Sequence, residues 1–377
     1  MSSSIVRKGY LSELDIVRAF GIIGVLLIHA TSSAVVSTDP YSLEFTAYAS
    51  FNQLSRFAVP IFFLLSGLSL FYNYHEKPFT VKAVKIFYTK RIAKILLPFV
   101  LFSLLYYAVV VYFRYGYTDL TQFTSHFFTW DFVVKLLIGK TYAHLYFIFI
   151  IIQYYLLFPL LWFAIQRWPN RQRWLIPSGL LVQWLYMMVA DDLGIKYVTS
   201  GCFAYSLYFC IGAYIGINYS KHQHNGKHRL GGASLRLMLS ALWVLLGAFY
   251  VYFAIYEAQG RMVFTQPFAI EIMDEVYITT ACLLLISLAL FINESSLRAL
   301  KKLLIHLGVT SFGIYLIHPL FLKYYRLMDI QTNSSIYGLW IAGGFFVALL
   351  GSWAIVTCAG KVRGHWILFG QISHKKK

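Results

Sequence analysis

Apolar residues in this chain occur in long runs separated by short polar connections. Ten runs are each about 17 to 25 residues long, which is enough for an α-helix to cross the hydrocarbon core of a bilayer. The runs lie near residues 14–34, 51–74, 95–113, 145–166, 174–190, 200–219, 236–256, 275–293, 303–325 and 335–359. This pattern predicts an all-α polytopic integral membrane protein with about ten transmembrane helices, formed as one domain over residues 1–377.

Basic residues are unevenly divided between the two sides that these helices define. With the connections assigned alternately, 23 of the 32 lysines and arginines fall on the side that holds both termini, and seven fall on the other. Because lysine and arginine are retained on the cytoplasmic side of a membrane, both termini are predicted to be cytoplasmic. The formal charge of +17 is therefore a topology signal, and nucleic acid is not expected as a partner.

Composition agrees with this fold class, because 59% of the residues are hydrophobic and only 12% are charged. The first run lacks a small-residue cleavage site, so it is predicted to be an uncleaved first helix. The four cysteines lie in apolar segments without CxxC spacing, so neither a disulfide framework nor a zinc site is expected, and no metal. The longest connection, roughly Arg114–His144, is predicted to be an outer re-entrant segment or lid.

The first apolar run is unusual because it contains Asp15, Arg18 and His29. At about 100° per residue, eleven residues return a helix to within roughly 20° of its starting direction, so Arg18 and His29 share one face and Asp15 lies near Arg18. Arg18 and His29 are about 16 Å apart along the axis. Ionisable residues at such depth usually face a cavity or a bundle interior, although His29 alone also fits a hydrogen bond to a neighbouring helix.

Three further runs carry basic or titratable residues at a similar predicted depth. Arg56, in the second run, lies about 8 Å below the predicted outer surface, close to the depth of His29. His318 falls in the outer third of the ninth run, and His144 falls at the outer mouth of the fourth. Each residue alone is compatible with packing, but four at one depth predict a shared site.

A second polar group is predicted at the cytoplasmic face, where Lys90, Arg91 and Lys94 lead into the third run. Arg91 and Lys94 are three residues apart, so they share one helix face. They adjoin the apolar run, where paired cations suit a polyphosphate. The alternative is ordinary anchoring by lysine and arginine side chains that extend to the membrane surface.

Five short motifs follow one another along the ten predicted helices. They are Leu14-Asp15-x-x-Arg18 with His29, Arg56-x-x-Val59-Pro60-x-Phe62-Phe63-x-x-Ser66-Gly67, Arg91 with Lys94, His144-Leu145-Tyr146-Phe147 leading to Pro159, and Ser311-x-Gly313-x-Tyr315-Leu316-x-His318-Pro319. Any one of these motifs is weak, but together and in this order they are specific. Over essentially its whole length the chain resembles the membrane-bound acyltransferase-3 family of bacterial O-acyltransferases.

The resemblance implies that acyl-CoA is used from the cytoplasm, that the acceptor is a hydroxyl at the outer face, usually on a glycan, and that Arg18 and His29 are an essential pair. Two departures from the family pattern matter. Lys94 stands where the family often has a second arginine, and the segment starting at His144 is followed by Gln153 and no acid. The second departure makes the chain similar to the branch of transferases of the poly-N-acetylglucosamine intercellular adhesin and the enterobacterial common antigen.

The expected function is transfer of an acyl group, acetyl or succinyl, from cytoplasmic acyl-CoA to a hydroxyl of a cell-surface or exported polysaccharide or of a lipid-linked glycan. The expected location is the bacterial plasma membrane, in contact with membrane lipid. Residues expected at the chemistry are His29, as general base, with Arg18 and Asp15. Residues expected to hold the acyl-CoA donor are Arg18, Lys90, Arg91 and Lys94. Residues expected to contact the acceptor are Arg56, Ser66, His144, Tyr315 and His318.

An exporter or flippase for a glycan or lipid-linked glycan is the alternative, because polar residues in several spans also describe a permeation path. The distribution of polar residues argues against it. Basic residues gather at the inner mouth and histidines at the outer, with no continuous charged relay between them.

Overall fold

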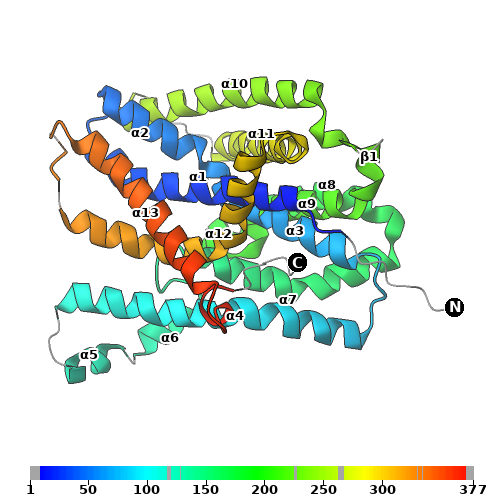
Figure 1. Ribbon diagram of the computed structural model, residues 1–377, viewed down its shortest axis with the longest axis horizontal. Helices are drawn as coiled ribbons and strands as arrows, with labels where there is room; N and C mark the ends of the chain where they lie inside the picture. Colours follow the sequence, from blue (N-terminus) through cyan, green and yellow to red (C-terminus); the bar gives the residue numbers. More distant parts are fainter. Residues whose placement is uncertain are drawn as a thin grey trace. The chain divides into compact units, whose positions relative to one another are not determined.

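The computed structural model of the chain describes residues 9–116, 120–127, 129–224, 227–261, 267–328, 330–332 and 334–370 (Figure 1). In this part, the regular structure is helical apart from one antiparallel pair of two-residue strands, β1 (Gln223–His224) and β2 (Lys227–His228). Eight helical segments of the described chain are long and apolar enough to cross a membrane. The chain is therefore an all-α polytopic membrane protein, as its apolar runs predict.

The eight segments coincide with eight of the ten predicted runs. They are formed by α1 (Ser12–Ser37), α2 (Leu43–Leu54) with η1 (Arg56–Ala58) and α3 (Pro60–Tyr74), α4 (Val81–Tyr115), α7 (Tyr146–Arg167), α10 (Ala233–Ala258), α11 (Pro267–Glu294), α12 (Arg298–Tyr325) with η7 (Arg326–Met328), and α13 (Tyr337–Ala359). The other two runs form α8 (Leu175–Asp192) and α9 (Ser206–Asn218), which are outside those eight. The count of ten transmembrane helices stays a prediction. So does the cytoplasmic placement of both termini, of which residues 1–8 and 371–377 lie outside the described part.

Shorter elements connect these helices. They are α5 (Leu120–Phe127), α6 (Trp130–Leu137), η2 (Pro169–Trp174), η3 (Val198–Ser200), η4 (Cys202–Tyr205), η5 (Ser220–His222), η6 (Arg229–Gly231) and α14 (Trp366–Phe369). The predicted outer segment at Arg114–His144 thus contains two short helices, α5 and α6, which both contact α4.

Contacts within the chain define two compact units, each built from two stretches of sequence. The α1/α12 unit comprises Met1–Phe62 and Asn218–Cys358, and the α4/α7 unit comprises Phe63–Ile217 and Ala359–Lys377. The predicted site residues are divided between the units. The first contains Asp15, Arg18, His29, Arg56, Tyr315 and His318, and the second contains Ser66, Lys90, Arg91, Lys94 and His144.

In the α1/α12 unit, α1 packs along α12 and also contacts α2 and α11. Its apolar side chains Ile16, Ile22 and Leu26 are completely buried. Where the two helices meet, Gly308 of α12 faces the main chain of α1, and a Cβ atom at this position would clash with the carbonyl oxygen of Asp15. Glycine therefore allows the close approach that fixes α12 against the polar end of α1.

In the α4/α7 unit, glycines allow α3 and α9 to cross closely. A Cβ atom at Gly67 would clash with the Phe209 carbonyl oxygen, and one at Gly212 would clash with the Leu64 carbonyl oxygen. Helix α4 is 35 residues long and contacts α7 over part of its length. Its N-terminus is capped by Thr80, whose hydroxyl accepts a hydrogen bond from the Ala83 amide at 3.2 Å.

Candidate active site

A buried carboxylate lies at the first turn of α1. Asp15 is 3% exposed, and the guanidinium of Arg18, one turn later, forms an ion pair with its Oδ1 atom. The Tyr10 hydroxyl donates a hydrogen bond to the other carboxylate oxygen. Burial raises the pKa of Tyr10, and the bond to Asp15 raises it further, so the phenol stays protonated and continues to donate. The predicted proximity of Asp15 and Arg18 is confirmed, and two donors offset the cost of burying the carboxylate.

A second buried carboxylate, Glu13, lies beside this pair and is not among the residues that the sequence predicts for the site. Glu13 is 7% exposed and accepts hydrogen bonds from the Tyr219 hydroxyl and from the Asn293 side chain. Asn293 in turn accepts a hydrogen bond from the Ser12 hydroxyl at 2.8 Å. This network ties the start of α1 to the end of α11.

Deeper in the α1/α12 unit, the structure brings His29 and His318 together. Their ring centroids are 5.1 Å apart, and the ring of Tyr315 lies 5.9 Å from that of His318. His318 is fully buried, and its Nδ1 atom lies 3.1 Å from the carbonyl oxygen of Ile314. Since a carbonyl only accepts, this hydrogen bond requires Nδ1 to carry the hydrogen. Three of the predicted residues thus form one cluster.

The turn of α1 that carries His29 is held from two directions. Arg326, in η7, donates from its Nη2 atom to the carbonyl oxygens of His29 at 2.6 Å and Ala30 at 3.4 Å. Asn52, in α2, donates to the carbonyl oxygen of Ile28 at 3.2 Å. Neither Arg326 nor Asn52 is predicted by a sequence motif, although both determine where His29 lies.

Arg56 lies in a cluster of its own with residues of α10 and α11. Its Nη2 atom forms an ion pair with the Oδ2 atom of Asp274 at 2.7 Å, and its guanidinium lies 5.3 Å from the centroid of the Tyr250 ring. Tyr250 donates a hydrogen bond to the second carboxylate oxygen of Asp274. A planar guanidinium is therefore held by a carboxylate and an aromatic face at once.

Arg56→Lys is expected to impair the predicted acyl transfer nearly as much as Arg56→Ala, about tenfold or more, because a flexible ammonium cannot reproduce a planar guanidinium held by Asp274 and the Tyr250 ring. The free energy of unfolding should change by less than about 1 kcal/mol, since the Arg56 side chain is 44% exposed and an exposed ion pair contributes little. Initial rates measured with Arg236→Lys as the control test this, because Arg236 also lies over an aromatic ring, that of Phe291. Full activity of Arg56→Lys would reduce Arg56 to a packing role.

In the α4/α7 unit, the three predicted donor-binding cations lie along one stretch of α4. Lys90 is exposed, whereas Arg91 and Lys94 are half-buried. The Arg91 guanidinium is hydrogen-bonded to the hydroxyls of Tyr74 and Tyr155. Two tyrosines thus orient this guanidinium, which has five N–H donors in total.

The two remaining predicted residues are also in the α4/α7 unit. Ser66 lies half-buried on α3, one residue before the glycine that packs on α9. His144, just before α7, is 1% exposed, and its ring centroid lies 4.8 Å from that of Tyr106 and 5.6 Å from that of Tyr142. The structure therefore places His144 in an aromatic cage, and its predicted contact with an acceptor stays a prediction.

The chain matches one family model over residues of both units. Residues 11–357 match the family model described as an acyltransferase domain. The chain belongs to the acyltransferase 3 family. Comparison with curated proteins and with solved structures gave no match. The family that the sequence motifs resemble is confirmed, and the membrane acyltransferase activity of this family applies to the chain.

For an acyltransferase 3 protein, the cluster around His29 has the chemical groups that acyl transfer requires. An imidazole can accept and return a proton. The Arg326 guanidinium lies nearby, bonded to main-chain carbonyl oxygens. His318 adds a second ring with a defined tautomer, and Tyr315 adds a hydroxyl-bearing ring. These groups come from α1, α12 and η7, which lie against one another in one compact unit.

Proposed function

We propose that this acyltransferase 3 protein transfers an acyl group, acetyl or succinyl, from cytoplasmic acyl-CoA to a hydroxyl of a cell-surface or exported polysaccharide, or of a lipid-linked glycan. Its location is the bacterial plasma membrane. The observation that best supports the proposal is the contact between His29 and His318 beside Arg326, inside a member of this family. A proton acceptor fixed near a cation suits attack of a hydroxyl on a thioester.

In the proposed reaction His29 is the general base. It takes the proton of the acceptor hydroxyl while the hydroxyl oxygen attacks the carbonyl carbon of the thioester. A carbon–oxygen bond forms, the carbon–sulfur bond breaks, and the proton passes from His29 to the departing thiolate of CoA. His318, Tyr315 and Arg56 orient the acceptor on this side of the chemistry, and Ser66 and His144 are further candidates for acceptor contact.

The donor phosphates are assigned to cations near the predicted cytoplasmic ends of the helices. Arg18, oriented by Asp15, serves this role on α1, and Lys90, Arg91 and Lys94 serve it on α4. Along α1, Arg18 and His29 are about 16 Å apart, which is comparable with the reach of an extended pantetheine arm. A CoA held by its phosphates near Arg18 would therefore present its thioester at the depth of His29.

The double variant Arg91→Ala/Lys94→Ala is expected to raise the KM for acyl-CoA by about tenfold or more while changing the KM for the acceptor little, because charge-assisted bonds to phosphate are lost. The matched control is Lys82→Ala/Lys85→Ala, which removes two lysines from the first turns of the same helix. Donor titration at saturating acceptor measures the effect. An unchanged KM for acyl-CoA in the Arg91/Lys94 variant would contradict this assignment.

The acceptor proposed is a glycan of the type modified by transferases of the poly-N-acetylglucosamine intercellular adhesin and the enterobacterial common antigen, on the sequence resemblance to that branch. Mass spectrometry of surface polysaccharide from cells with and without the protein tests the function. Surface glycan of normal amount that lacks O-acyl groups in the deletion strain supports transfer. Glycan that accumulates inside the cells would instead identify an exporter.

A further inference from the structure

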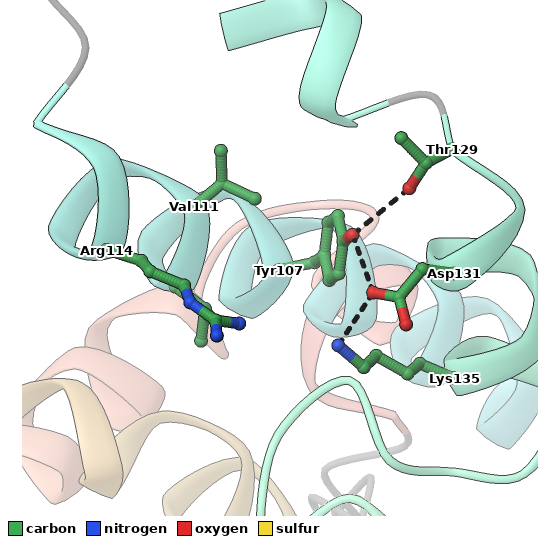
Figure 2. A pocket seen from close by; sticks show the side chains of 7 residues that line it. Tyr107, Val111, Arg114, Thr129, Asp131 and Lys135 are labelled. Atoms are coloured by element: carbon green, nitrogen blue, oxygen red, sulfur yellow. Dashed lines mark hydrogen bonds and ion pairs between the residues drawn. The ribbon is translucent and has the colours of Figure 1, made fainter.

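A pocket with charged residues in its lining lies at the C-terminal end of α4, where the proposed reaction assigns no role to any residue. It has a volume of about 340 Å³, and its lining includes Tyr107, Val111, Arg114, Thr129, Asp131 and Lys135 (Figure 2). This volume is at the lower end of the range for small-ligand sites. Arg114 is about 35 Å along α4 from Arg91, so the pocket is at the opposite end of the helix from the proposed donor cations.

One wall of the pocket is fixed by packing and by hydrogen bonds. Tyr107 is 5% exposed, and its ring centroid lies 5.5 Å from that of Phe127 and 4.9 Å from that of Phe132. Its hydroxyl donates to the Oδ2 atom of Asp131 at 3.1 Å and lies 3.3 Å from the hydroxyl of Thr129. Helices α4 and α6 are thus joined by hydroxyl and carboxylate groups in the pocket lining.

The charge of the lining favours an anion. Lys135 lies 2.7 Å from the Asp131 carboxylate, and its hydrogen bond is the main cause that lowers the pKa of Asp131, so this carboxylate stays ionised at neutral pH. Arg114 points toward the same space from α4 (Figure 2). Two cations and one carboxylate leave a net charge of +1 on the charged lining residues. An ordinary ion pair between residues i and i+4 of α6 accounts for the contact between Lys135 and Asp131. It does not account for a concave site that Arg114 of α4 also lines.

We propose that this pocket binds an anionic sugar unit, a saccharide that carries a carboxylate or phosphate group. The guanidinium of Arg114 matches the geometry of such a group. The hydroxyl of Thr129 and the carboxylate of Asp131 match ring hydroxyls. The phosphate of a lipid headgroup shares the anionic chemistry, and a glycerol headgroup also offers hydroxyl donors to Asp131, so the experiment includes a headgroup analogue. The biological meaning rests on the proposed function, in which the pocket holds part of the acceptor glycan.

Binding to purified full-length protein in phosphatidylcholine nanodiscs tests the proposal without any acyl transfer. The probes are glucuronate, glucose as its neutral counterpart, and glycerol 1-phosphate as the headgroup analogue, measured by ligand-observed NMR. Glucuronate is expected to bind about tenfold or more tightly than glucose, because one charge-assisted contact is worth about this factor. Added salt should weaken glucuronate binding.

Variants connect the binding to the pocket. Arg114→Gln is expected to weaken glucuronate binding about tenfold or more. Arg173→Gln, which alters another arginine of the same unit beside Trp174, is expected to leave it unchanged. Tyr107→Phe removes only the hydroxyl that contacts Asp131 and keeps the packed ring. A smaller loss of glucuronate binding is expected in this variant, which tests the pocket even if Arg114→Gln lowers the yield of folded protein.

Each outcome separates the alternatives. Equal binding of glucuronate and glucose, or binding that both pocket variants leave intact, would overturn the proposal. Glycerol 1-phosphate binding as tightly as glucuronate, with loss of glucuronate binding in nanodiscs that contain phosphatidylglycerol, would assign the pocket to lipid. Acyl transfer that is normal in Arg114→Gln, at every acceptor concentration, would remove the pocket from the reaction and leave the proposed function standing. If the protein bound glucuronate but had no transferase activity, the proposed function would be wrong and the binding site would stand.

Discussion

Replacement of His29 with alanine is expected to lower the rate of acyl transfer by about 10²- to 10⁴-fold, the usual contribution of a general base. The His29 ring lies beside His318, and its carbonyl oxygen accepts a hydrogen bond from Arg326. The backbone bonds do not depend on the imidazole, so the variant should keep its fold. Initial rates in nanodiscs, together with the thermal unfolding midpoint, measure both effects.

His29→Gln separates a base from a structural residue. A glutamine amide keeps much of the size and hydrogen bonding of imidazole but cannot accept a proton at neutral pH. It should therefore be nearly as inactive as alanine, while acyl-CoA binding is retained because Arg18, Arg91 and Lys94 are untouched. The control is His365→Gln, at a histidine beside α14 whose ring bonds to the Val362 carbonyl oxygen. Substantial activity in His29→Gln would overturn the mechanism and leave the family assignment intact.

Much of the fold and part of the site follow from the periodicity of the sequence. The apolar runs predict the helices because a membrane span must satisfy its own backbone hydrogen bonds. The turn angle of a helix predicts that Asp15 lies beside Arg18, and it does. Depth along a span predicts that His29 and His318 lie at one level, and their rings are in contact. The helical period determines the first result, whereas distance from a span end gives only the common level of the two histidines and not their contact.

Partners from remote segments could not be predicted in this way. Arg326 and His29 are 297 residues apart, and Arg56 and Asp274 are 218 residues apart. Neither the helical period nor the membrane depth says which helices are neighbours. Gly308 shows the same limit, because its contact with the Asp15 backbone depends on where α12 crosses α1. Asp15 and His29 can be singled out because they interrupt an apolar run, but Arg326 lies at a span end, where arginine is unremarkable.

Arg326→Gln is expected to lower kcat by about 10²-fold, because this side chain holds the main chain of His29 and a displacement of about 1 Å near the reacting atoms costs this much. Its two bonds to the carbonyl oxygens of His29 and Ala30 fix the end of α12 to α1. Loss of these bonds should also reduce the free energy of unfolding, by no more than about 3 kcal/mol. Arg326→Lys should recover part of the rate, since an ammonium also donates to a carbonyl oxygen but is carried on a shorter, flexible side chain that holds it less firmly in place.

The kinetic pattern distinguishes positioning from general stability. If Arg326 acts on His29, kcat falls while the KM for acyl-CoA stays near its original value, because the donor-binding cations are unaffected. The control is Arg261→Gln, which removes an exposed arginine of the same unit whose guanidinium lies 5.1 Å from the centroid of the Tyr41 ring. This variant should keep full activity. A fall in the unfolding midpoint of Arg326→Gln with kcat unchanged would make Arg326 a purely structural clasp between α1 and η7, and His29 would then owe its position to Asn52 and to the packing of α12.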